Sequence, residues 1–343
     1  MKRAKKVLTL VTVLPDHHNK VVQEGTSKLF IKEFFSESLL LKELSGYEIV
    51  SKYYPVARLL NRDTCQKENR LIFEFEKSIG SNRGLLLDIF NNAESTSSFD
   101  AIFHMYKSVF DKTIEKTAAS AADIFFKDRA SKLKEKYLNL CKTTEPVELN
   151  FKESHISINF SEIVDRVMSH FEEEGQGESW SIISQGDPSD VNVGIKPVLL
   201  DYLCGGRVPM MAEFASLVWE QVAQSAILAP TYNPKAYTDH DLVYKNPPAV
   251  SMQNGHLEFV PPKDRLLFLS EYTTRVIMPI MKRIEYPTWY RDFKNYIAMR
   301  ILGVFDINNF SLEHKSLALG YLELFYNVWM PQTPIELIKL ITK

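Results

Sequence analysis

Cysteine is scarce in this chain of 343 residues, and the three that occur, Cys65, Cys141 and Cys204, lie far apart. Three scattered cysteines give no metal-binding spacing, and they suit a reducing compartment better than an oxidising one. We therefore expect a cytoplasmic protein. The eight histidines form no H-E-x-x-H motif and no cluster with cysteine, so the sequence gives no reason to predict a zinc site.

Long hydrophobic runs are also lacking. No apolar segment reaches the ~18 residues that a membrane-spanning helix requires. The run from Val7 to Leu14 follows a basic N-terminus and superficially resembles a signal peptide. Threonines interrupt this run, however, and no small-residue cleavage site follows it, so the run predicts a first β-strand.

The chain has no excess of charge of one sign. Its 41 Lys and Arg residues nearly balance its 43 Asp and Glu residues, for a net charge of -2. This balance gives no electrostatic argument for a nucleic-acid or membrane partner, and we expect neither. A composition that is 45% hydrophobic and 24% charged is typical of a globular protein with one large domain or two smaller ones. The oligomeric state is left open.

The order of predicted elements divides the chain into two parts. Residues 1–78 contain predicted strands at 5–14, 20–24, 26–35, 56–60 and 70–75, with one helix between the third and fourth strands. Residues 79–343 begin with a linker at 79–82 and are mainly helical. Their predicted helices cover 84–90, 99–110, 112–137, 160–174, 211–228 and most of 264–343. Asn254-Gly255 between alternating apolar residues predicts a β-hairpin inside the irregular stretch 230–262. The predicted fold class is α+β.

One motif in the second part points to chemistry. Asp187 and Asn192 form a D-x-x-x-x-N loop, and the apolar run after it ends in Asp201. Phosphoryl transfer to a hydroxyl needs a carboxylate to accept the proton, and an amide and a second carboxylate to hold magnesium. We therefore predict that Asp187 is the base and that Asn192 and Asp201 are metal ligands. The apolar runs 180–183 and 198–201 suggest a hairpin-like setting for the loop. Chance occurrence in a polar loop is the alternative, because short motifs are often false positives.

The motif and the element order together resemble the protein-kinase-like fold, and more closely the aminoglycoside phosphotransferase and choline kinase family. The family's H-G-D-x-x-x-x-N loop is similar to Gln185-Gly186-Asp187 through Asn192, and its Asp-aromatic strand end is similar to Leu199-Leu200-Asp201-Tyr202. The resemblance covers residues 5–80 and 178–220. Its other matching segments are Phe30-Ile31-Lys32, Glu43-Leu44-Ser45-Gly46-Tyr47, Leu71-Ile72-Phe73-Glu74-Phe75-Glu76, Gly205-Gly206-Arg207 and Glu213-Phe214-Ala215.

This resemblance implies a bilobal protein that uses ATP and Mg²⁺. The N-terminal lobe, residues 1–78, would have a small antiparallel sheet and bind the nucleotide, and the C-terminal lobe, residues 79–343, would be mainly helical. Lys32 would contact the α- and β-phosphates, and an ion pair to Glu43 would hold it in place. Backbone groups of Glu74, Phe75 and Glu76 would pair with adenine.

Alternatives remain for the lysine and its partner. Taken alone, Lys32 would be read as an ordinary edge-strand lysine. Glu37 and Glu48 lie near Glu43 and compete with it for the role of partner.

The sequence departs from the family pattern at several places, among them a short connection from Asn192 to Asp201 that implies a tight hairpin around Gly194. Gln185 replaces the histidine that braces the loop, and its amide could form a similar hydrogen bond. Glu213 stands where the family has aspartate at the start of a helix. The loop between the first two strands is not rich in glycine.

Two features bear on the phosphate acceptor. Protein serine/threonine kinases usually carry a lysine two residues after the catalytic aspartate, and that position is Ser189 here. The segment from Asp201 to Glu213 is also too short for a peptide-docking activation loop. Both favour a hydroxyl on a small molecule, and the family implies an amino sugar or amino alcohol. Residues 160–174, 232–244 and the C-terminal helices would form the acceptor pocket. A catalytically inactive nucleotide-binding protein and a peptide-modifying kinase remain as alternatives.

Overall fold

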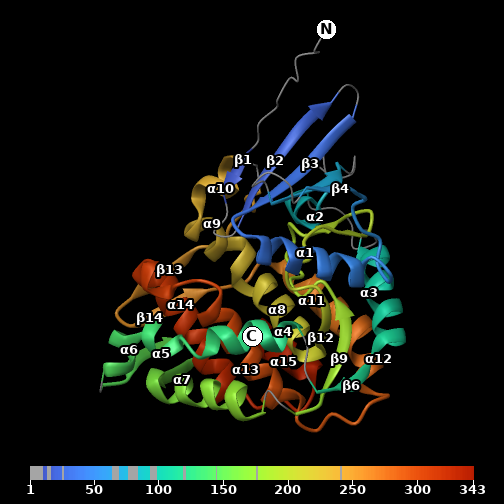
Figure 1. Cartoon of the computed structure of the whole chain (residues 1–343). Coiled ribbons are helices and arrows are strands. Elements are labelled where there is room, and N and C mark those ends of the chain that lie inside the picture. Colours follow the sequence, from blue (N-terminus) through green and yellow to red (C-terminus); the bar gives the residue numbers. More distant parts are fainter. Residues whose placement is uncertain are drawn as a thin grey trace.

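The computed structural model describes residues 11–13, 17–24, 27–63, 69–75, 84–92, 99–118, 121–143, 145–174, 177–239 and 242–343 (Figure 1). Helices and antiparallel sheets both contribute, which confirms the predicted α+β class. A five-stranded sheet lies at one end of the molecule, at the top of Figure 1, and most of the helices lie below it. The predicted domain boundary after residue 78 falls among residues 76–83, outside the described residues.

The five-stranded sheet is antiparallel throughout, in the order β1-β2-β3-β5-β4. The predicted strand 56–60 starts later, at Leu59, because Val56 instead forms a bridge to Leu199. Residues 5–10 of the predicted first strand lie outside the described part of the chain. The strands are β1 (Val11–Val13), β2 (His17–Glu24), β3 (Ser27–Phe34), β4 (Leu59–Asp63) and β5 (Arg70–Glu74).

Helix α1 (Glu37–Val50) connects β3 to β4 and begins where the Ser36 hydroxyl accepts a hydrogen bond from the Leu39 N–H at 3.3 Å. It packs directly against the segment that follows Asp201. A Cβ on Gly46 would lie only 1.9 Å from the carbonyl oxygen of Tyr202, so no larger residue fits at this crossing. The Tyr202 hydroxyl in turn accepts a hydrogen bond from the Ala57 N–H at 3.3 Å. These contacts fix α1 and the end of the predicted catalytic motif relative to each other.

The helices of the second part surround a core formed by α8 and α13. Every residue of α8 is buried, and Phe214 of α8 lies 5.5 Å from Phe293 of α13, ring centroid to ring centroid. No helix among the described residues combines the length and apolar composition needed to span a membrane. The α-helices are α2 (Leu86–Asn92), α3 (Asp100–Thr113), α4 (Ala121–Ala130), α5 (Leu133–Lys136), α6 (Leu138–Lys142), α7 (Phe160–Ser169), α8 (Met210–Trp219), α9 (Ala229–Tyr232), α10 (Pro234–Asp239), α11 (Lys263–Tyr272), α12 (Met278–Met281), α13 (Trp289–Gly303), α14 (Leu312–Glu323) and α15 (Pro334–Thr342).

Several helices continue as π-helical segments, in which the hydrogen bonds span one more residue. The segment η3 extends α8 directly and is buried along its whole length. The π-helical segments are η2 (His170–Glu174), η3 (Glu220–Leu228), η4 (Thr273–Ile277) and η6 (Leu324–Val328), and a short 3₁₀ turn, η5 (Ile307–Asn309), follows α13.

A three-stranded sheet corrects two predictions. The predicted helix 112–137 is wrong in its first turns, because α3 ends at Thr113 and β6 (Glu115–Thr117) pairs with β9 (Ser179–Ser184). Cross-strand contacts favour the strand: Lys116 lies over the Trp180 ring, 5.4 Å from its centroid. The other neighbour of β9 is β12 (Gly206–Pro209). The run 180–183 therefore does not form a hairpin with 198–201 as expected. Instead β11 (Val198–Leu199) pairs with β10 (Val193–Gly194).

Two distant hairpins form a four-stranded sheet in the order β13-β14-β7-β8. The predicted Asn254-Gly255 turn is confirmed, and both residues have the positive φ that such turns require, 50° and 77°. The hairpin of β7 (Val147–Phe151) and β8 (Ser154–Ile158) was not predicted, because its turn residues Lys152 and Glu153 adopt positive φ without a glycine or asparagine to signal it. The remaining strands are β13 (Val250–Gln253) and β14 (His256–Phe259).

Candidate active site

The catalytic loop, residues 186–192, leaves the end of β9 and is held from behind. Gln185 is fully buried, and its amide donates a hydrogen bond to the Tyr106 hydroxyl of α3 at 3.3 Å. Gly186 has a φ of 76°, and a Cβ there would lie 2.4 Å from the carbonyl oxygen of Cys204. The loop therefore starts at a position that only glycine can occupy. Gln185 braces the loop with a side-chain hydrogen bond, in the way expected from the family resemblance for an amide in place of the histidine.

The loop brings Asp187 and Asn192 together. The Asn192 amide donates to the backbone oxygen of Asp187 and to its Oδ2, both at 3.3 Å. The Leu200 N–H donates to the backbone oxygen of Asn192 at 3.1 Å. Asn192 and Leu200, which precedes Asp201, therefore face each other at the open end of the β10–β11 hairpin. Asn192 is thus bonded both to Asp187 and to the residue that precedes Asp201.

Lys32 of β3 bonds two carboxylates. Its Nζ lies 2.6 Å from Glu43 Oε1 and 2.8 Å from Asp201 Oδ1. Lys32 and Glu43 are buried, whereas the Asp201 side chain is 28% exposed. Of the three candidate partners, Glu43 forms the pair, while Glu37 and Glu48 are exposed.

The protonation of this group follows from burial and charge. Burial alone would lower the pKa of Lys32, but Asp201 and Glu43 together raise it above its ordinary value. Burial raises the pKa of Glu43 to about 8, against the opposing charge of Lys32. A single ammonium thus bonds the side chains of both Glu43 and Asp201, and of these two only the Asp201 side chain is partly exposed.

Asn192 and Asp201 are suited to magnesium. Mg²⁺ prefers oxygen ligands, usually one or two protein groups together with phosphate oxygens and water. The Asn192 side-chain oxygen accepts no hydrogen bond from any described residue, and Asp201 presents a partly exposed carboxylate. Within the described chain, no three or more His, Cys, Asp and Glu residues are grouped so that they could hold a metal by themselves.

The predicted adenine-binding segment is only partly described. The Glu74 N–H donates to the backbone oxygen of Arg58 at 2.8 Å, and the Phe75 N–H donates to that of Lys28 at 3.0 Å. Both N–H groups are therefore engaged within the sheet. Glu76 lies outside the described residues. The role of these three residues stays a prediction.

Two residues that the sequence did not reveal lie beside the predicted base, and one of them, Arg300, contacts it directly. Arg300 of α13 uses Nη2 to bond both Asp187 Oδ1 and Glu220 Oε1, the latter at 2.7 Å. Arg300 and Glu220 are buried, and Glu220 is the first residue of η3. Arg300 lies 113 residues from Asp187, so no local motif connects them. The available signal was a charged residue inside each of two strongly apolar helical runs.

A second buried arginine anchors the middle of the catalytic loop. Arg265 of α11 bonds Asp190 at 2.6 Å, and both side chains are fully buried. The Arg265 guanidinium also lies between two aromatic rings, 4.6 Å from the centroid of Phe90 and 4.7 Å from that of Tyr244. The Asp190 end of the loop is therefore tied to α11 and to the segment before it.

Glu213 of α8 lies beneath the loop and is fully buried. Burial raises its pKa to about 7, and the nearby charge of Asp187 adds to this effect. The ordinary pKa of a glutamate is 4.5, so between about pH 4.5 and pH 7 the unfolded chain has lost the proton of Glu213 while the folded protein still holds it. Stability should consequently fall as the pH rises through this window.

We expect Glu213→Gln to remove this dependence. Each unit of pKa difference corresponds to about 1.4 kcal/mol of free energy. The unfolding free energy of the wild type should therefore fall by about a few kcal/mol between pH 4.5 and 7 because of Glu213, and that of the variant should lack this decrease. Urea unfolding at several pH values measures the difference. The exposed Glu162→Gln serves as the control and should follow the wild-type curve. Parallel wild-type and Glu213→Gln curves would contradict the assignment.

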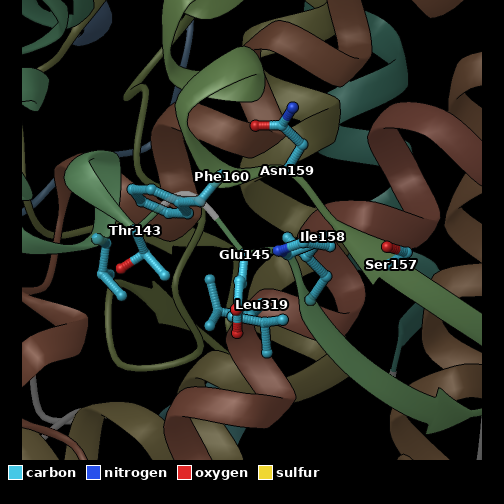
Figure 2. Close-up of a pocket in the computed structure, with 10 residues that line it drawn as sticks. Thr143, Glu145, Ser157, Ile158, Asn159, Phe160 and Leu319 are labelled. Atoms are coloured by element: carbon cyan, nitrogen blue, oxygen red, sulfur yellow. The ribbon is translucent and has the colours of Figure 1, made fainter.

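A separate cavity of about 230 Å³ lies near α6, the β7–β8 hairpin and Leu319 of α14. Figure 2 shows Phe160, Asn159 and Glu145 around it. Phe160 and Leu319, which belong to segments expected to form the acceptor pocket, line this cavity, but none of the predicted catalytic, nucleotide-binding or metal-binding residues does. It is therefore not part of the candidate site.

Comparison with known proteins adds evidence only at the level of structure. No family model matches the chain. No curated protein sequence matches it either. A thermostable mutant of aminoglycoside phosphotransferase APH(4)-Ia, in a ternary complex with ADP and hygromycin B, is 8% identical over 95% of this chain and 94% of its own, with a TM-score of 0.52.

Two further solved structures are similar. The apo form of the same aminoglycoside phosphotransferase mutant is 10% identical, covers 93% of both chains and has a TM-score of 0.51. The ethanolamine kinase of Plasmodium vivax is 12% identical over 93% of this chain and 83% of its own, with a TM-score of 0.48. At these identities the similarity is one of fold. The resemblance seen in the sequence is thereby confirmed at this level: the chain has the kinase-like fold of the aminoglycoside phosphotransferases.

Proposed function

We propose that this protein is an ATP-dependent phosphotransferase that moves the γ-phosphate of Mg-ATP to a hydroxyl of a small molecule. The observation that carries the proposal is the Lys32 group, in which one buried ammonium bonds Glu43 and Asp201. Asp187 and Asn192 are hydrogen-bonded to each other. Lysine, paired glutamate, base, amide and metal-binding carboxylate are the set that phosphoryl transfer uses.

Each side chain would have one task in the reaction. Lys32 contacts the α- and β-phosphates, and Glu43 keeps its ammonium in place. The acceptor oxygen forms a bond to the γ-phosphorus while the bond from that phosphorus to the β–γ bridging oxygen breaks, and ADP leaves. Asp187 takes the proton of the hydroxyl and later releases it to water. Asn192 and Asp201 would hold magnesium, which when bound neutralises charge on the phosphates.

The proposal includes the arrangement in two lobes. Residues 1–78 would form the nucleotide-binding lobe, and residues 79–343 the lobe that holds the base and the acceptor. Glu74, Phe75 and Glu76 would pair with adenine through their backbones. Helix α1 supports this division, because it belongs to the first part by sequence and presents Glu43 toward Asp201 of the second.

We further propose an acceptor of the amino sugar or amino alcohol type. Ser189 replaces the lysine that protein kinases use, and only 11 residues separate Asp201 from Glu213, too few for a peptide-docking loop. The similar structure of aminoglycoside phosphotransferase APH(4)-Ia contains ADP and hygromycin B, which agrees with a small hydroxylated acceptor.

The test is a transfer assay with labelled Mg-ATP. The purified chain is offered a panel of amino sugars, amino alcohols and simple alcohols, with a peptide library as a second arm, and products are identified by mass. Label on a small molecule that depends on Mg²⁺ supports the proposal. Label on peptides alone would favour a peptide-modifying kinase. Thermal stabilisation by Mg-ATP without transfer to any acceptor would favour a nucleotide-binding protein without catalysis.

A further inference from the structure

Arg300 occupies an unusual place, because its side chain bonds both the predicted base and a second buried carboxylate. Nη2 contacts Asp187 Oδ1 and, at 2.7 Å, Glu220 Oε1. We infer that Arg300 is the positioning residue of the transfer site: it fixes the Asp187 carboxylate and supplies from α13 the positive charge that the catalytic loop lacks. This inference rests on the proposed function.

The catalytic loop has no cation of its own. Residues 186–192 contain two aspartates and neither lysine nor arginine, and Ser189 occupies the position of the protein-kinase lysine. Negative charge on the transferring phosphoryl group is spread over three oxygens, and catalysis depends mainly on positioning and on positive charge near it. Among the described basic residues, Arg300 is the one that bonds Asp187. A distant helix therefore provides what the loop does not.

Two other cations that follow the loop in the sequence, Lys196 and Arg207, are placed differently. Lys196, in the turn between β10 and β11, is exposed. Arg207 of β12 bonds Glu115 at 2.7 Å and also donates to the backbone oxygen of Thr113. These contacts hold β12 and the start of β6 together, so Arg207 is used in the sheet.

The Asp187 carboxylate is fixed at both oxygens. Arg300 bonds Oδ1, and the Asn192 amide donates to Oδ2 at 3.3 Å. The Asp187 side chain remains 30% exposed, so an acceptor hydroxyl can still approach it. A base held in this way does not have to be ordered again at each turnover, which is the advantage of a preorganised site.

Arg300 is itself firmly held. Glu220 accepts further hydrogen bonds from Gln224 and Ser225, which face it because the helix is π-helical from Glu220 onward. Such segments often occur at functional sites. Burial alone would lower the pKa of Arg300, but Asp187 and Glu220 raise it above its ordinary value, so the guanidinium stays charged. Its Nε is buried and donates to none of the described residues.

A purely structural ion pair is the competing explanation, and the chain contains a matched control. Arg265 is equally buried and bonds Asp190 of the same loop at 2.6 Å, but it does not contact Asp187. If Arg300 only stabilises the fold, the loss of either arginine should have similar consequences. If Arg300 acts in transfer, the two variants should differ in turnover and in their response to an added cation.

The experiment compares Arg300→Ala, Arg300→Lys and Arg265→Ala in the full-length protein. For Arg300→Ala we expect kcat to fall by about 10²–10³-fold, as for loss of one preorganised charge donor, with the KM for Mg-ATP changed by less than about threefold. Arg300→Lys should retain part of the activity, since it keeps the charge but not the planar fork. Millimolar guanidinium should raise the kcat of Arg300→Ala by about tenfold or more. It should not raise the kcat of Arg265→Ala.

The outcomes separate this inference from the proposed function. If the wild type transfers no phosphate to any acceptor, the proposed function fails and the inference with it. If the wild type is active and Arg300→Ala keeps its kcat, or loses it without rescue by guanidinium, the inference alone is overturned. Should Arg300→Ala fail to fold, Arg300→Lys decides between the two explanations. A kcat lowered by about tenfold or more at unchanged nucleotide affinity supports the inference. A wild-type kcat overturns the inference.

Discussion

Asp187→Asn is expected to lower kcat by about 10²–10⁴-fold, the range that a positioned general base contributes. An asparagine keeps the size of the side chain, and its oxygen can still accept a hydrogen bond from Arg300, so the loop should fold as before. It cannot accept the acceptor's proton. Since Lys32, Glu43 and Asp201 are untouched, the dissociation constant of Mg-ATP should change by less than about threefold, or ~0.6 kcal/mol.

Two measurements check this expectation. Transfer of labelled phosphate to the acceptor gives kcat, and titration calorimetry gives the affinity for Mg-ATP in the same preparation. Asp165→Asn is a suitable control, because Asp165 is half-exposed on α7 and, among the described residues, forms an ion pair with the exposed Lys134 alone, at 2.6 Å. A variant Asp187→Asn that turns over at the wild-type rate would show that another group takes the proton, and the proposed mechanism would be wrong.

The parts of the site that the sequence revealed are those set by local chain geometry. A D-x-x-x-x-N loop closes on itself, so Asp187 and Asn192 meet because a tight turn allows little else. Asn254-Gly255 predicted its hairpin for a similar reason, since few residues other than asparagine and glycine tolerate positive φ. In both cases the chemistry of two to six consecutive residues determines the structure.

Contacts between distant segments were found only where a family pattern connected them. Lys32 and Asp201 are 169 residues apart, and no periodicity relates them. The resemblance implied the ion pair of Lys32 with Glu43, which the structure contains, but it did not imply the second bond, from Lys32 to Asp201. Arg300 and Arg265 had no such support: each is one of several charged residues of its helix, and nothing in its own segment indicates which carboxylate it meets.

The errors in the fold have the same physical origin. The stretch after Thr113 is rich in lysine and alanine, which favour helix, yet β6 forms because its backbone completes the edge of β9. The β7–β8 hairpin accepts two strained turn residues because both of its strands bury large apolar side chains, among them Leu149, Phe151 and Ile156. In each case tertiary pairing outweighs local preference.

Lys32→Met is expected to be costly for both stability and activity. Removing the ammonium leaves the carboxyl of Glu43 buried without its partner and close to that of Asp201. Lys32 holds down the pKa of Glu43, which burial raises, so its loss favours a neutral, unpaired Glu43 in the folded protein. Breaking a buried pair on one side typically costs about 3–5 kcal/mol, and we expect a loss of that order in unfolding free energy. Mg-ATP binding should weaken at least tenfold, about 1.4 kcal/mol, because the phosphates lose their cation.

A double variant separates these two effects. Lys32→Met combined with Glu43→Met removes both buried charges and fills the space with apolar groups, so most of the lost stability should return. Phosphate transfer should not return, because no ammonium faces the phosphates. Lys20→Met is the control within the same sheet, since its pair with Glu33 is partly exposed and its removal should cost less than about 1 kcal/mol. A double variant that regained transfer would show that the Lys32–Glu43 pair serves the fold and not the nucleotide.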